Sequence, residues 1–145
     1  MFEKNLLNGQ TIVITGGGTG LGKSMSRRFG ELGANIVISG RRKEKLEETA
    51  DEFSKLGINV LTCPGDVRKL EDVELMTSQA IDKFGKIDGL LNNAAGNFIS
   101  PTEMLSPNAF KVVIDIVLMG TWNCTSTIGK EMIKNKKGNV LSIVT

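Results

Sequence analysis

A run of glycines near the N-terminus is the strongest chemical signal in the sequence, and it reads Thr15-Gly16-Gly17-Gly18-Thr19-Gly20-Leu21-Gly22. Residues 11–15, which lead into it, are all β-branched, and a segment with helical apolar spacing follows. Glycine lets the backbone turn sharply and approach a ligand, and free N–H groups at a helix start attract phosphate oxygens. This strand-turn-helix context predicts that a dinucleotide is bound here. The predicted contacts are Gly16, Gly18, Thr19, Gly20 and Leu21.

Two other interpretations of the glycine run are weaker. Gly22 is followed by Lys23-Ser24, but the spacing from Gly18 to Gly22 is one residue too short for a P-loop. A glycine cluster alone can also be a flexible turn, although a position between a buried strand and an amphipathic helix disfavours that reading.

The charge at the end of the next predicted strand indicates which dinucleotide is bound. The chain reads Ile38-Ser39-Gly40-Arg41-Arg42 there, and the first carboxylate is Glu44. Sites selective for NAD place a carboxylate near this point for the ribose 2′-OH, whereas arginine matches a 2′-phosphate. We therefore predict NADPH as the cofactor, bound by Arg41 and Arg42, although Arg42 alone could be a solvated charge at a helix start.

Composition excludes several other classes of site. The chain has 145 residues, a formal net charge of +2, no His, no Tyr and 2 Cys. No zinc, haem or iron–sulfur ligand set can be assembled from Cys63 and Cys124, which we interpret as small buried hydrophobes, so no metal is predicted. The small net charge does not indicate a protein that binds nucleic acid.

No stretch approaches roughly 18 consecutive apolar residues, so we predict no membrane span. The N-terminus carries no leader pattern, which favours the cytoplasm.

Five short apolar runs, mostly rich in β-branched residues, alternate with longer helical patterns, and these elements must position the glycine run and the arginines. The predicted strands are residues 11–15, 35–39, 58–62, 88–91 and 139–145, and the longest predicted helix is 107–135. Crossovers of a dozen residues or more imply parallel pairing. The sequence thus predicts an α/β fold, a doubly wound parallel sheet of the Rossmann type with α/β/α layers. Residues 1–145 form a single domain in this prediction, and we expect it to be incomplete after the fifth strand.

Predicted helix boundaries agree with this organisation. Gly33, Gly57 and Gly85 follow helical segments as stop signals. Ser106-Pro107 supplies a capping hydroxyl and then a proline at the first helical position.

Three motifs in order make the chain resemble the short-chain dehydrogenase/reductases. They are the glycine pattern, Asp66-Val67 after the third predicted strand, and Asn92-Asn93-Ala94-Ala95-Gly96 after the fourth. The resemblance implies that Asp66 accepts from the adenine amine and that Val67 packs on the adenine ring. It places Asn93, Ala94, Ala95 and Gly96 beside the nicotinamide ribose. Asn92 and Asn93 can also bridge neighbouring strands, because buried amides need partners.

A narrower resemblance is to the 2,4-dienoyl-CoA reductases of that superfamily. It rests on Asp66-Val67-Arg68, the run from Asn92 to Glu103, Leu105-Ser106-Pro107-Asn108-Ala109, and Asp115-Ile116-Val117-Leu118. Ordinary members have an Asn where this chain has Val117, and the dienoyl-CoA reductases share that departure. The resemblance implies that Asn97 binds the thioester carbonyl, that Phe98 and Ser106 line an acyl-CoA site, and that Arg68 meets a CoA phosphate. Without the resemblance, Phe98 could be core, Ser106 a helix cap and Arg68 a surface charge.

The implied reaction is transfer of a hydride from NADPH to the δ-carbon of a 2,4-dienoyl thioester, followed by protonation of the α-carbon by the family's Tyr, which gives 3-enoyl-CoA during breakdown of unsaturated fatty acids. Asn97 would stabilise the charge on the thioester oxygen. The family's Tyr and Lys would lie beyond residue 145, so we expect these 145 residues to bind cofactor without turnover. Thr145 aligns roughly with the catalytic Ser of ordinary members and is a further catalytic candidate. The family also implies a homo-oligomer, usually a tetramer.

Two other functions remain open on the sequence. An NADPH-dependent 3-ketoacyl reductase or sugar dehydrogenase fits the glycine run equally well but does not fit Val117. A non-catalytic dinucleotide-binding module would fit the lack of tyrosine if the chain were complete. Against completeness, the helix 107–135 would leave apolar side chains uncovered, namely Phe110, Val113, Ile114, Val117 and Trp122.

Overall fold

Five parallel strands form one sheet in the order β3-β2-β1-β4-β5 in a computed structural model that describes residues 2–144. Their bounds are β1 (Thr11–Thr15), β2 (Asn35–Gly40), β3 (Val60–Pro64), β4 (Gly89–Asn92) and β5 (Asn139–Ser142). The strand order reverses between β1 and β4, because the chain first builds outward to β3 and then returns to the other side of β1. The carboxyl ends of these two central strands therefore define the crevice where doubly wound sheets bind ligands.

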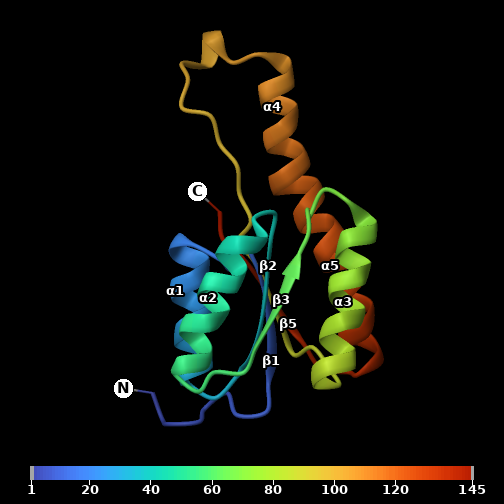
Figure 1. Ribbon diagram of the computed structural model, residues 1–145. Helices are drawn as coiled ribbons and strands as arrows, with labels where there is room; N and C mark the ends of the chain where they lie inside the picture. Colours follow the sequence, from blue (N-terminus) through green and yellow to red (C-terminus); the bar gives the residue numbers. More distant parts are fainter. Residues whose placement is uncertain (1, 145) are drawn as a thin grey trace.

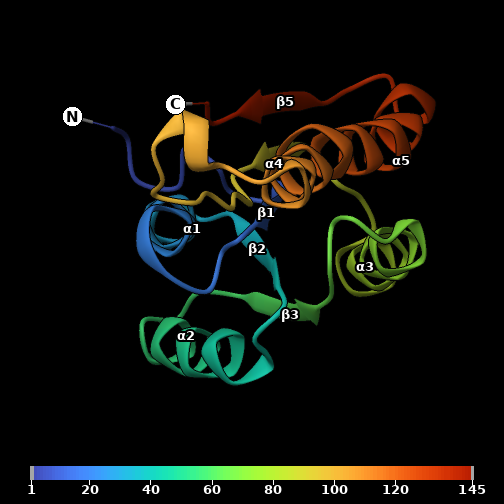
Figure 2. The ribbon, with the colours of Figure 1, turned by 90° about the horizontal axis from the view of Figure 1, so that it is seen from above.

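Helices cover both faces of the sheet (Figures 1 and 2). Helices α1 (Gly20–Glu31) and α2 (Lys43–Lys55) lie on one face. The other face carries α3 (Leu70–Phe84) and α5 (Gly120–Lys134). The predicted doubly wound α/β sheet with α/β/α layers is confirmed.

Alternation along the strands divides the core in two. Val13 and Val37 point to the cluster with α3 and α5, whereas Ile14, Ile36 and Ile38 point to the cluster with α1 and α2. All five side chains are fully buried. A strand with apolar residues on both faces is expected in a parallel sheet covered on both sides.

The predicted third strand, 58–62, is placed two residues too early. Gly57 (φ +75°) ends α2 in the left-handed conformation, and the Ile58 N–H donates to the Phe53 carbonyl at 3.0 Å. This hydrogen bond caps the C-terminus of α2, and the Ile58 side chain is buried. Because Ile58 belongs to the cap, the strand begins only at Val60. Gly33 and Gly85 also adopt positive φ at helix ends, as predicted.

The predicted final strand, 139–145, is too long. It pairs with β4 only as far as Ser142, because β4 ends at Asn92 and its chain then turns away from the sheet. Thr145 lies outside the described residues.

The long helix begins as predicted, since the Ser106 hydroxyl accepts from the Ala109 N–H at 3.2 Å and Pro107 opens the first turn. It is not one regular α-helix. A π-helical segment, η2 (Asp115–Met119), separates α4 (Pro107–Ile114) from α5. One extra residue in the turn changes which side chains face the sheet.

Exposure on this helix is uneven. Phe110, Val117 and Trp122 are exposed, as expected, whereas Val113 and Ile114 are half-buried. Pro107–Lys134 is also long and apolar enough to cross a membrane by length and composition, a test that core helices of globular domains pass as well. The absence of a membrane span therefore stays a prediction.

Both cysteines are buried, and we expect neither to react in the folded protein. Burial raises the pKa of Cys63 to about 11 and that of Cys124 to about 12. The thiolate is the nucleophile, and near pH 8 only about one thousandth or less of a thiol with such a pKa is ionised to the thiolate. Mass spectrometry after iodoacetamide should find no label until guanidinium unfolds the chain. Rapid labelling of the native protein would contradict this burial.

Candidate functional site

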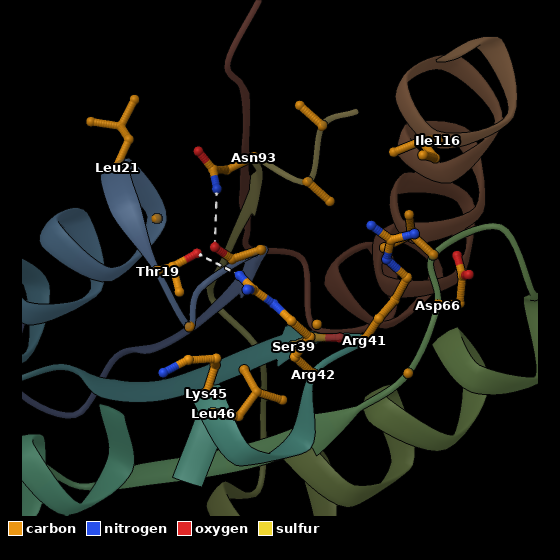
Figure 3. Close-up of a pocket in the computed structure, with 18 residues that line it drawn as sticks. Thr19, Leu21, Ser39, Arg41, Arg42, Lys45, Leu46, Asp66, Asn93 and Ile116 are labelled. Carbon is orange, nitrogen blue, oxygen red and sulfur yellow. Dashed lines mark hydrogen bonds between the residues drawn. The ribbon is translucent and has the colours of Figure 1, made fainter. Parts of the chain in front are cut away.

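A cavity of about 460 Å³ lies at the carboxyl ends of β1, β2 and β4, at the point where the strand order reverses (Figure 3). Its size is in the range of small-molecule sites. The glycine turn, the end of β2, the turn after β3 and the turn after β4 all contribute to its wall. The lining residues are Gly16, Gly18, Thr19, Leu21, Gly22, Ser39, Gly40, Arg41, Arg42, Lys45, Leu46, Gly65, Asp66, Val67, Asn93, Ala94, Ala95 and Ile116.

The glycine turn is shaped by close backbone contacts. Gly16 has φ +67°, a conformation that favours glycine. A Cβ on Gly22 would collide with the Gly16 carbonyl and lie 2.5 Å from the Asn93 Nδ2 atom. A Cβ on Gly17 would lie 2.5 Å from the Ile38 side chain. Only glycine therefore lets α1 begin this close to the ends of β1 and β4.

The turns after β1 and β4 are joined by hydrogen bonds. The Thr15 hydroxyl accepts from the Asn93 N–H at 3.0 Å and from the Ala94 N–H at 2.9 Å. The Asn93 side chain donates to the carbonyls of Thr15 and Gly16. Asn92 donates to the Thr125 hydroxyl of α5 at 3.1 Å and to the Ser142 hydroxyl of β5 at 3.5 Å, so the strand-bridging interpretation is confirmed, whereas contact with the nicotinamide ribose stays a prediction. These contacts hold the floor of the cavity rigid.

Three cations from the turn between β2 and α2 and from the first turn of α2 line the cavity. Arg41 and Arg42 are exposed, and Lys45 follows one turn later. The Arg42 guanidinium donates to the Thr19 hydroxyl at 3.5 Å, which brings it against the glycine turn (Figure 3). The carboxylate among the lining residues is Asp66. An arrangement with this excess of positive charge favours a bound phosphate.

Asp66 is held by Arg68. The Arg68 Nε donates to both Asp66 carboxylate oxygens at 3.0 Å, and its Nη2 lies 2.5 Å from Oδ2. This pairing lowers the pKa of Asp66 against the opposing effect of desolvation, and Arg41 adds to the lowering. Asp66 is thus ionised at neutral pH. Its charge is paired mainly with Arg68, and although Arg41 also interacts with it, the lining keeps an excess of positive charge.

The residues present fit a nicotinamide dinucleotide phosphate. Thr19 precedes α1 without making a side-chain cap hydrogen bond, so the first N–H groups of that helix remain available to a pyrophosphate. The glycines leave room for close approach, and the arginines supply charge for a further phosphate. Asp66 and Val67 line the far end, where the sequence predicted the adenine.

Most predicted cofactor contacts lie together on this cavity, but Gly20 and Gly96 do not line it. Gly20 supplies a turn with φ +55°, and Gly96 packs so closely that a Cβ would lie 2.7 Å from the Ile116 side chain. Sequence reasoning missed Ser39, Gly40, Lys45, Leu46, Gly65 and Ile116 as lining residues, and it named Gly22 only within the motif. Arg41 and Lys45 are four residues apart, about one helical turn, and this spacing could have indicated Lys45 as a lining residue. Nothing in the local sequence indicates Ile116.

The predicted substrate residues lie outside this cavity. Asn97 and Phe98 follow its rim in the exposed segment that climbs from β4 to the short 3₁₀ turn η1 (Thr102–Met104) (Figure 1). The Asn97 Oδ1 accepts from the Phe98 N–H at 2.8 Å. Ser106 caps α4, and Arg68 is engaged with Asp66. The structure does not bring these four residues into one pocket, and their roles stay predictions, as does that of Thr145.

Comparison with known proteins identifies relatives. The sequence profile of the family described as short chain dehydrogenase matches residues 10–145. A peroxisomal 2,4-dienoyl-CoA reductase of Arabidopsis thaliana, described as (3E)-enoyl-CoA-producing, is 42% identical over 137 residues, which is 94% of this chain and 46% of that protein. A probable (2E)-enoyl-CoA-producing 2,4-dienoyl-CoA reductase of Bacillus subtilis is 41% identical over 132 residues, 91% of this chain and 52% of that protein.

A solved structure agrees with the fold. The crystal structure of a short chain dehydrogenase from Bacillus anthracis superposes with a TM-score of 0.91 at 46% identity, covering 96% of this chain and 56% of that one. The chain thus spans about half the length of the curated relatives it matches.

Proposed function

Since this chain belongs to the short chain dehydrogenase family, we propose that the complete protein is an NADPH-dependent 2,4-dienoyl-CoA reductase acting in the breakdown of unsaturated fatty acids. The observation that carries the proposal is the match to two curated relatives of that name, at 41% and 42% identity over more than nine-tenths of this chain. The two relatives are described with different products, a (3E)- and a (2E)-enoyl-CoA. We propose the 3-enoyl product, as the sequence resemblance implies.

The cofactor is proposed from the charge of the cavity. NADPH would supply the hydride. The glycine turn and the start of α1 would hold its pyrophosphate, Arg41 and Arg42 its 2′-phosphate, and Asp66 with Val67 its adenine. Asn93 and Ala94 would border the nicotinamide ribose, because their turn is fixed against Thr15 by hydrogen bonds.

The proposed role of Asn97 follows from its position and its hydrogen bond. Its oxygen accepts from the Phe98 N–H, and its Nδ2 group is the donor that a substrate oxygen would meet. A donor two residues past the cavity rim suits a substrate carbonyl held next to the nicotinamide end. Negative charge that collects on a thioester oxygen during reduction would be stabilised by such a donor.

An assay of the complete protein separates this proposal from its alternatives. Loss of NADPH absorbance with a 2,4-dienoyl-CoA should exceed that with a 3-ketoacyl-CoA or a sugar substrate. An equal or greater rate on the ketone would favour the 3-ketoacyl reductase. Tight NADPH binding with no turnover on any of these substrates would favour a non-catalytic binding module.

Arg41→Ala should weaken NADPH binding about 10- to 30-fold and leave NADH binding nearly unchanged, because the lost contact is a charge-assisted bond to the 2′-phosphate. Isothermal titration of both nucleotides measures the ratio. Arg27→Ala is a matched control. Arg27 is an exposed arginine of α1 that does not line the cavity, and its Nε lies 2.9 Å from a Glu31 carboxylate oxygen. Equal losses for NADPH and NADH would mean that Arg41 does not select the phosphate.

A further inference from the structure

We propose that Lys45 is a third cationic ligand of the cofactor's 2′-phosphate and that Glu48 competes with the phosphate for it, an inference that rests on the proposed use of NADPH. Lys45 lies outside the glycine, aspartate and asparagine motifs of the sequence. Its assignment comes from the cavity itself.

Three observations place Lys45 on the wall of the cavity that the arginines also line. Lys45 lies in the first turn of α2 and lines the same cavity as Arg41, Arg42 and Thr19. Its backbone carbonyl carbon would lie 3.5 Å from a Cβ on Gly18, so the helix turn that carries Lys45 abuts the glycine turn. Figure 3 shows Lys45 on the Thr19 side of the cavity, with its amino group turned away from Arg41 and Arg42.

The start of α2 is itself suited to an anion. Arg42 occupies the N-cap position and makes no side-chain cap hydrogen bond, so the first N–H groups of the helix lack a side-chain acceptor. The positive end of a helix, two arginines and one lysine then face the same space. Glu44 is the acidic residue in that turn, and it does not line the cavity.

The present partner of Lys45 is one that a phosphate can displace. The Lys45 Nζ lies 2.7 Å from a Glu48 carboxylate oxygen, three residues along the helix. The two side chains are 45% and 59% exposed, and surface pairs of this kind contribute little in water. A phosphate ester carries between one and two negative charges at neutral pH, more than a single carboxylate. The lysine side chain is long and flexible enough to exchange one anion for the other.

Calorimetric titration of the complete protein with two pairs of probes tests this. NADPH and adenosine 2′,5′-bisphosphate carry the 2′-phosphate, whereas NADH and ADP lack it. Lys45→Met should raise the Kd of the first pair about 3- to 10-fold, the loss of one charge-assisted contact at a half-exposed site, and leave the second pair unchanged. Lys43→Met is the matched control, because Lys43 pairs with Glu47 at 3.6 Å on the same helix and does not line the cavity.

The competition is tested with Glu48→Gln. Releasing Lys45 should lower the Kd of NADPH about 2- to 3-fold, and Glu47→Gln should not. In a Lys45→Met background the benefit of Glu48→Gln should vanish. If it persists, Glu48 acts by simple repulsion and the exchange is overturned.

Two further outcomes separate this inference from the proposed function. If NADPH is preferred and Arg41→Ala removes the preference, but Lys45→Met behaves like Lys43→Met, then only the role of Lys45 is wrong. If the unsubstituted protein does not prefer NADPH over NADH, then both the inference and its premise fail.

Discussion

Replacing Asn97 with alanine should lower kcat on a 2,4-dienoyl-CoA by about 100-fold or more, the effect expected when one donor to a developing oxyanion is removed. The NADPH dissociation constant should stay within about 2-fold of its original value, since Asn97 does not line the cofactor cavity. Single-turnover rates of NADPH oxidation measure the first quantity, and titration measures the second.

The structure gives the reason for separating these two quantities. The Asn97 side chain is fixed by its own neighbour, with Oδ1 bound to the Phe98 N–H, and contributes nothing to the glycine turn or the arginines. Asn59→Ala is a suitable control, because Asn59 is exposed just before β3, at the opposite end of the sheet. An unchanged kcat in the Asn97 variant would remove this residue from the reaction.

Replacing Gly22 with alanine should weaken NADPH binding about 100-fold and lower the free energy of unfolding by about 2–3 kcal/mol, the upper part of the range for overpacking. The added Cβ would meet the Gly16 carbonyl and the Asn93 amide. Both neighbours belong to the hydrogen-bonded floor of the cavity, so neither can move without opening the turn that contacts the pyrophosphate.

Gly129 supplies the matched control for Gly22. It lies within α5, and a Cβ there would meet nothing within 4 Å. Gly129→Ala should therefore raise stability by about 0.5–1 kcal/mol, the ordinary gain from alanine in a helix, without affecting NADPH binding. Denaturant unfolding and nucleotide titration of both variants make the comparison. Normal NADPH affinity in Gly22→Ala would show that close approach at this turn is not needed.

Much of the candidate site follows from local sequence. The glycine turn could be predicted because glycines between a β-branched run and a helical segment indicate a sharp turn, and Gly16 does adopt a positive φ. The close contacts that Gly17 and Gly22 make with Ile38 and Asn93 come from the tertiary structure. The arginine pair was visible because the end of β2 lies beside the first turn in any doubly wound sheet. The predicted start of the third strand was wrong because Ile58 takes part in the cap of α2 instead of pairing in the sheet.

The sequence by itself determined the parallel α/β fold, the place of the phosphate-binding turn and the sign of charge around it, because these depend on hydrophobic periodicity and on residue types close together in the chain. Only the tertiary structure decided which groups are already engaged. Asp66 is paired with Arg68, Lys45 with Glu48, and Ile116 reaches the cavity from a π-helical turn. Such pairings depend on side-chain directions and on packing between distant elements, and a linear pattern of residues does not fix either of these.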